Sequence, residues 1–300
     1  MTWVGAAGAV AAVAVCAGLV ACSPLAAINA LSPANGSDST TDVAYGPGAR
    51  NKLDIYRPAQ ATAASPVVVF FYGGNWVSGQ RADYAFVGRA LAARGIVVVI
   101  PDYRLYPEVR YPDFLDDSAQ AVAWTAAQIG RYGGDPARVF LMGHSAGAYN
   151  AAMLALDPRW LGKQGVATSA LRGWIGLAGP YDFLPVTNLT TRPVFHFPDT
   201  PAESQPIDHA DGSFLPALLI AARKDSVVNP VRNTGGLATR LRSHGVPVQE
   251  IYYDGVSHTT LVASLAAPLR SLAPTLDAVE QFVRAQGPRA LDAGSSRVKQ

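Results

Sequence analysis

The chain reads RVFLMGHSAGAYNAAMLAL from Arg138 to Leu156, a pattern that predicts an apolar strand, a sharp turn and an alanine-rich helix. The turn is Gly143-His144-Ser145-Ala146-Gly147. Side chains at Gly143 and Gly147 would collide with neighbouring backbone in so tight a turn, which explains the two glycines. The turn therefore exposes Ser145 at the end of a strand, which is the setting of a nucleophilic serine.

The segments around this turn alternate between strand and helix patterns. Such alternation predicts an α/β fold with a mainly parallel central sheet and helices on both faces. Strands are expected at 66–71, 96–100, 171–177, 216–221 and 248–253, helices at 82–94, 113–129, 231–244 and 273–284, and an antiparallel edge hairpin at 43–56.

One long segment, from Phe183 to Gly212, has no helical or strand period and contains several prolines. Long irregular insertions in compact domains are usually functional lids or disordered. We expect this segment to be a small irregular lid.

Four polar motifs, YGGNW, GHSAG, RKDS and GVSH, each directly follow a predicted strand. In open α/β sheets the functional site lies outside the carboxyl ends of the strands. The sequence therefore places all four motifs at one site.

A serine hydroxyl needs a base within hydrogen-bond reach and a carboxylate that orients the base. His258, in the loop after the last strand, is the favoured base, and Asp225 is the favoured acid. The order Ser145, Asp225, His258 is the nucleophile–acid–base order of α/β hydrolases. Asp182 also follows a strand and is the alternative acid.

The other four histidines are weaker candidates for the base. We expect the side chain of His144 to point away from Ser145, and His244 suits a helix C-terminus. His196 and His209 lie in the irregular insertion.

Attack on an ester carbonyl creates an oxyanion that needs fixed hydrogen-bond donors. The backbone N–H of Ala146, directly after the serine, is one candidate donor. Gly74 and Asn75, in the glycine-rich loop after the strand at 66–71, are the others, because glycines allow close approach to a substrate.

Composition narrows the class of protein. The chain has 300 residues, 49% of them hydrophobic, so a sizeable core is available. A net charge of +2 without long runs of like charge argues against nucleic acid as a partner. The only two cysteines are Cys16 and Cys22, so a domain that begins after them has no thiolate metal site and no disulfide.

The N-terminal segment from Thr2 to Ala21 is apolar and uncharged, and it ends in Leu-Val-Ala-Cys22. This ending resembles the lipobox of bacterial lipoproteins, which implies a signal peptide at 1–21 and a lipid on Cys22. No Lys or Arg lies near Met1, unlike most secretory signals. A simple secretory signal and an uncleaved anchor are the alternatives.

We therefore expect export to a bacterial cell envelope, with a lipid anchor in a membrane and a domain facing the periplasm or the exterior. The predicted organisation is a flexible tether at 22–42, a catalytic domain at 43–287 and a tail at 288–300.

Taken together, the motifs resemble those of the hormone-sensitive-lipase-like esterases. YGGNW is similar to their His-Gly-Gly-x-Trp oxyanion motif, RKDSVV to their acid loop and GVSH to their histidine loop, while DYRLYPEVRYP, YGGDP and GHSAG are similar to the blocks between them. The resemblance spans residues 42–284 and implies an α/β-hydrolase fold. It is closest to small bacterial carboxylesterases and arylformamidase-like members.

Two departures from that family matter. Tyr72 stands where the motif usually has histidine, so the support of the oxyanion loop must differ. No helical cap precedes the first strand, which leaves the insertion to cover the site and implies a shallow acyl pocket suited to small soluble esters.

The sequence thus predicts a serine hydrolase that cleaves small carboxylic esters and needs no metal or organic cofactor. Hydrolysis of an aryl formamide or another amide by the same three residues is an alternative, as is a non-catalytic surface lipoprotein on a hydrolase fold. The oligomeric state is left open.

Overall fold

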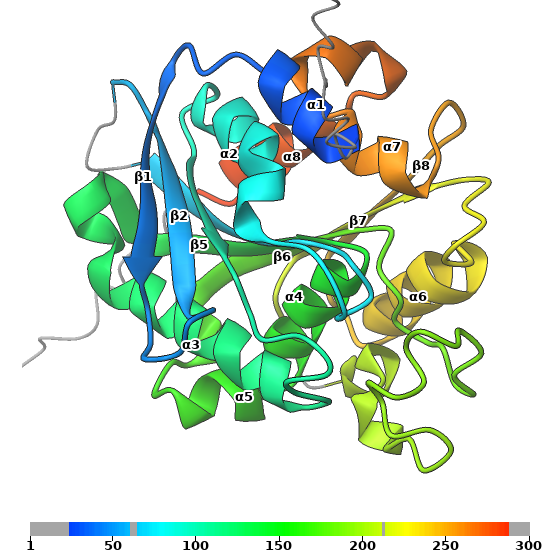
Figure 1. Cartoon of the computed structure of the whole chain (residues 1–300). Helices are drawn as coiled ribbons and strands as arrows, with labels where there is room; N and C mark the ends of the chain where they lie inside the picture. Colours follow the sequence, from blue (N-terminus) through cyan, green and yellow to red (C-terminus); the bar gives the residue numbers. More distant parts are fainter. Residues whose placement is uncertain (1–23, 61–64, 212–213, 288–300) are drawn as a thin grey trace, which may run out of the picture.

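The computed structural model describes residues 24–60, 65–211 and 214–287. An eight-stranded sheet in the order β1-β2-β4-β3-β5-β6-β7-β8 forms its centre, with helices on both faces (Figure 1). Strands β1 and β2 are antiparallel to their neighbours. The other six strands, β3 to β8, run parallel to one another. The predicted fold class, including the antiparallel edge hairpin, is confirmed.

The strands at the centre of the sheet are apolar because helices cover both of their faces. Every residue of β3, β4 and β7 is buried, whereas the edge strand β1 is largely exposed. The strands are β1 (Ser37–Ala44), β2 (Lys52–Pro58), β3 (Ser65–Phe71), β4 (Val97–Pro101), β5 (Gly134–His144), β6 (Leu171–Leu177), β7 (Ala217–Ala222) and β8 (Val248–Tyr253).

In Figure 1, α1, α2, α7 and α8 lie on one face of the sheet, and α3, α4, α5 and α6 lie on the other. All residues of α4 are buried, and its small side chains let it pack closely on the middle strands. The helices are α1 (Pro24–Leu31), α2 (Ala85–Ala92), α3 (Asp113–Gln128), α4 (Ala146–Leu156), α5 (Pro158–Lys163), α6 (Gly236–Ser243), α7 (His258–Ala263) and α8 (Thr275–Ala285).

The prediction of a flexible tether is wrong from Pro24 onward, because α1 and β1 are part of the domain. The side chain of Asn29 in α1 donates to the backbone oxygens of Ala82 and Asp83 and accepts from the N–H of Phe86. Strand β1 pairs its backbone with β2 although its side chains are mostly polar. The polar composition of this segment does not indicate a strand, because backbone pairing at a sheet edge needs few apolar side chains.

Several predictions lie outside the described residues: the signal peptide at 1–21, the lipidated Cys22 and the tail at 288–300. Among the helices that the structure describes, none has both the length and the apolar character needed to span a bilayer.

The insertion is irregular over its described part, 183–211, apart from two short 3₁₀ turns at Ala202–Ser204 and Pro206–His209. It is nevertheless packed against the domain: Phe195 is buried and meets the rings of Trp76 and Phe183 at 4.8 and 5.1 Å between centroids. Gly212, its predicted end, lies outside the described residues.

Candidate active site

Ser145 occupies the turn between β5 and α4, with a left-handed φ of 54°. A Cβ added at Gly147 would lie 2.0 Å from the backbone oxygen of Phe71, and one added at Gly143 would lie 2.1 Å from that of Gly147. Neither contact is possible, so both glycines are required for the turn. The N–H of Ser145 donates to Leu177 of β6 at 2.9 Å, which ties the turn to the sheet.

The structure brings Ser145, His258 and Asp225 into one hydrogen-bonded chain. His258 Nε2 lies 2.9 Å from Ser145 Oγ, and His258 Nδ1 lies 2.7 Å from Asp225 Oδ2. Asp225 follows β7, and His258 is the first residue of α7. This geometry allows the imidazole to take a proton from the serine while the carboxylate holds its tautomer.

Asp225 is held as a carboxylate. Its side chain is fully buried, and this burial opposes ionisation, but hydrogen bonds from His258 and from the N–H groups of Val227 and Val228 outweigh it and lower its pKa. A buried anion at Nδ1 stabilises the imidazolium that would form during proton transfer.

The alternative acid, Asp182, is engaged elsewhere. It pairs with Arg232 at 2.7 Å and is not the carboxylate that contacts His258. Of the two candidate acids, only Asp225 lies within hydrogen-bond distance of His258.

His144 is buried beside His258, with the two ring centroids 5.0 Å apart. Its Nε2 lies 2.9 Å from the backbone oxygen of His258, and because a carbonyl only accepts, Nε2 carries the proton. Burial, reinforced by the neighbouring His258, lowers the pKa of His144 to about 3, so the ring is neutral. Sequence patterns did not predict this contact, which joins residues 114 positions apart.

The lowered pKa of His144 predicts a pH-dependent stability. Between pH 3 and its ordinary pKa of 6.5, the unfolded chain binds a proton that the folded chain does not. Stability is therefore lost as pH falls through this window, by about 2 kcal/mol from this residue between pH 7 and pH 5. Between pH 7 and pH 5, we expect the free energy of unfolding of His144→Gln, measured with urea, to fall by about 2 kcal/mol less than that of the wild type. Equal losses in both proteins would contradict the assignment.

The loop after β3 runs directly against the nucleophile. A Cβ at Gly73 would lie 3.0 Å from Ser145 Cβ, and Gly74 has a φ of 134° that suits only glycine. Asn75 and Ala146 line the same cavity as Ser145, and Gly74 directly precedes Asn75 in the loop. Ala146 opens α4, where backbone N–H groups have no partner within the helix.

Tyr72 stands where the hormone-sensitive-lipase-like esterases usually have histidine, and it is held by a buried network of hydrogen bonds directly before this loop. Its Oη donates to Asp102 at 2.9 Å and accepts from Arg50 at 2.8 Å. Arg50 also donates to the backbone oxygen of Gly79, and Tyr103 Oη donates to that of Tyr72. Burial raises the pKa of Tyr72, so the phenol stays protonated and keeps donating. A tyrosine–carboxylate–guanidinium network thus takes the place of the family's histidine.

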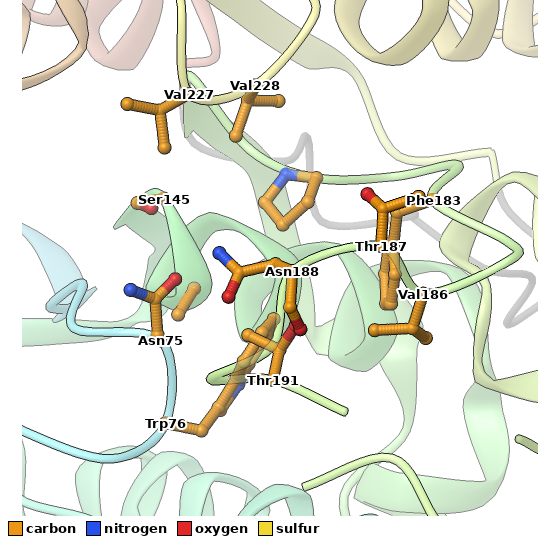
Figure 2. A pocket seen from close by; sticks show the side chains of 12 residues that line it. Asn75, Trp76, Ser145, Phe183, Val186, Thr187, Asn188, Thr191, Val227 and Val228 are labelled. Atoms are coloured by element: carbon orange, nitrogen blue, oxygen red, sulfur yellow. The ribbon is translucent and has the colours of Figure 1, made fainter. Parts of the chain in front are cut away.

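A cavity of about 80 Å³ opens above Ser145 (Figure 2). Val227 and Val228 come from the acid loop, and Asn188 of the insertion points into the cavity opposite Asn75. The lining carries no charged side chain within the described residues. Its apolar part includes Trp76, Pro180, Phe183 and Val186, and its polar part includes Asn75, Thr187, Asn188 and Thr191.

Within the residues described, no three His, Cys, Asp or Glu side chains come together as a metal site.

Comparison with known proteins places this geometry in a family. The BD-FAE family matches residues 53–241, which contain the oxyanion loop, Ser145 and Asp225. The chain belongs to the BD-FAE family. This membership and the eight-stranded sheet establish the α/β-hydrolase fold, in the carboxylesterase group.

Relatives of this BD-FAE member are esterases by name. Isoprenylcysteine alpha-carbonyl methylesterase ICME of Arabidopsis thaliana is 29% identical over 76% of this chain and 58% of its own. Esterase LipC of Mycobacterium tuberculosis is 31% identical over 67% of this chain and 54% of its own. The chain thus spans little more than half the length of these relatives.

Among solved structures, a thermostable esterase from Pseudomonas putida is similar with a TM-score of 0.67. It is 25% identical, and the match covers 87% of this chain and 86% of the other.

Proposed function

We propose that this BD-FAE member is a serine hydrolase that cleaves small carboxylic esters. The observation that carries the proposal is the pair of hydrogen bonds that links Ser145, His258 and Asp225 beside a cavity without charged lining residues. Similarity to proteins named esterases supports it.

In the proposed reaction, Ser145 Oγ attacks the acyl carbon and His258 Nε2 takes its proton. The N–H groups of Gly74, Asn75 and Ala146 stabilise the oxyanion. The intermediate collapses, the C–O bond to the alcohol breaks, and the alcohol leaves with the proton from His258. A water molecule deprotonated by His258 then attacks the acyl-enzyme, and the acid and free Ser145 are regenerated.

The cavity argues for a short, uncharged acyl group. Its volume of about 80 Å³ is enough for a short acyl chain, and Trp76 and Phe183 lie in its wall. A carboxylate or ammonium on the acyl chain would lose its water there without gaining a partner.

A chain-length series tests this proposal. We expect kcat/KM for p-nitrophenyl esters to peak at acetate or butyrate and to fall at least about tenfold at octanoate, because longer chains cannot be buried. An N-formyl aryl amide should be the poorer substrate. Faster turnover of the formamide, or no ester turnover at all, would contradict the proposal.

We propose further that Cys22 carries a lipid and holds the enzyme at a bacterial envelope membrane, facing the periplasm or the exterior. The uncharged segment Thr2–Ala21 and the sequence Leu-Val-Ala-Cys support this. Helix α1, which begins two residues later, adds support. Its exposed residues are all apolar, Leu31 being 69% exposed, although surface helices normally face water with polar residues. The exposed residues are Ala26, Ala27, Ala30 and Leu31.

Substitution of the cysteine tests this anchor. In a bacterial host the full chain should sediment with membranes, and Cys22→Ala should move it to the soluble fraction. Cys16→Ala, the matched control, should leave it in the membranes. A wild type that is soluble, or a Cys22→Ala protein that stays with membranes, would rule out the lipid anchor.

A further inference from the structure

Helix α4 carries a polar side chain, Asn150, in the interior of the protein. Its exposed fraction is zero, and a buried carboxamide is costly unless its polar atoms are paired. Its Oδ1 accepts from Trp76 Nε1 at 2.9 Å, and its Nδ2 donates to Ser118 Oγ at 3.3 Å. Ser118 Oγ in turn donates to the backbone oxygen of Phe114 at 2.8 Å. The side chain is therefore held at both ends.

The hydrogen bond between Trp76 and Asn150 joins the two separate elements that carry the proposed oxyanion donors. Ala146 lies at the start of α4, one turn before Asn150, whereas Asn75 precedes Trp76 in the loop after β3. The two partners of the bond are 74 positions apart in the chain. The bond thus links helix α4, which begins at Ala146, directly to the loop after β3.

The loop needs such a restraint. Asn75 and Trp76 have φ values of 55° and 59°, a conformation that costs non-glycine residues on the order of 1–3 kcal/mol each. Trp76 is 2% exposed, and its ring packs edge-on against Tyr149 and Phe195. Ring packing alone permits small sliding, but a hydrogen bond to the indole N–H sets one position along the ring plane.

We propose that the Trp76–Asn150 hydrogen bond sets the distance between the loop amides and the Ala146 amide, and that Asn150 is a positioning residue for the oxyanion. The inference rests on the proposed ester hydrolysis, because acyl transfer is the reaction that develops this charge. A misplacement of about 1 Å in such a site can cost about 10²-fold in rate.

Steady-state kinetics of Asn150→Leu and Trp76→Phe on p-nitrophenyl acetate test the inference. Each variant should lower kcat by about 10- to 100-fold, with KM within about threefold of the wild type, because oxyanion donors act in the transition state. The inhibition constant of a trifluoromethyl ketone, which forms the tetrahedral adduct, should rise by the same factor as kcat/KM falls. The double variant should be little worse than the worse single, since both remove one bond.

Tyr149→Phe is the matched control, because it removes a buried 2.7 Å hydrogen bond from the same helix to Ser204 and keeps the ring. Its kcat should stay within about threefold of the wild type. If Asn150→Leu does not fold, Trp76→Phe measures the same bond from the other side.

An Asn150→Leu kcat no lower than that of Tyr149→Phe overturns the inference alone, as does an unchanged inhibition constant or full multiplication of the two single effects. A wild type without esterase activity overturns the proposed function and the inference together.

Discussion

Ser145→Ala lowers kcat for p-nitrophenyl acetate by about 10⁴- to 10⁶-fold and leaves KM nearly unchanged. The methyl group cannot form the acyl-enzyme, so the remaining rate comes from the oxyanion donors and substrate binding alone. The loss should be this large because Ser145 Oγ lies 2.9 Å from His258 Nε2 and is the oxygen that forms the acyl-enzyme in the proposed reaction. Initial rates with enough enzyme to detect the residual activity measure it.

A fluorophosphonate probe gives a second measurement of the same residue. It should label the wild type at Ser145 and leave Ser145→Ala unlabelled. Ser243→Ala is a suitable control, since Ser243 is an exposed serine at the end of α6 whose Oγ bonds only to the backbone of Arg240 among its described contacts. Full esterase activity in Ser145→Ala would remove the basis of the proposed mechanism.

Asp225→Asn lowers kcat by about 10⁴-fold, the second large effect we expect. The carboxylate accepts the proton of His258 Nδ1 at 2.7 Å, which leaves Nε2 free to accept from Ser145. The amide of asparagine can donate to Nδ1 instead, which favours the tautomer with a proton on Nε2. In that tautomer the imidazole cannot act as the base.

The alternative acid provides the control for this experiment. Asp182→Asn removes one charge from the same end of the sheet but breaks only the exposed pair with Arg232. Its kcat should stay within about threefold of the wild type, because exposed ion pairs contribute little. Comparable losses in the two variants would mean that Asp225 acts through the charge of the region rather than through His258.

The prediction of His258 among five histidines rests on its place after the last strand and on the order of Ser145, Asp225 and His258 along the chain. In the structure, His258 lies within hydrogen-bond distance of both Ser145 and Asp225. A histidine after the last strand of an α/β sheet must lie at the same edge as a serine after an earlier parallel strand. The same argument left two acids open, because both Asp182 and Asp225 follow strands. Only the packing of the loop after β7 against α7 separates them.

Two other features differ from what local composition indicates. Ser257 caps α7 and makes His258 a helical residue, whereas the loop composition of 254–258 indicated irregular structure. Residues 24–42 were composed like a linker, but α1 and β1 find their partners on α2 and β2. For residues 24–42 a long-range partner decides the conformation, and local composition does not contain that partner. Helix α7 differs, because the local capping box between Ser257 and Thr260 starts it.

By itself, the sequence determined the local chemistry: the strained serine turn that requires Gly143 and Gly147, the alternation that produces a parallel sheet, and the strand ends where the polar motifs lie. These features follow from steric and hydrophobic rules that act over a few residues. The tertiary structure alone decided how distant groups meet: Asp225 rather than Asp182 at His258, Tyr72 on Asp102, and Asn150 on Trp76. Such pairings depend on how complete elements pack, because packing sets distances of a few ångströms between residues far apart in the chain.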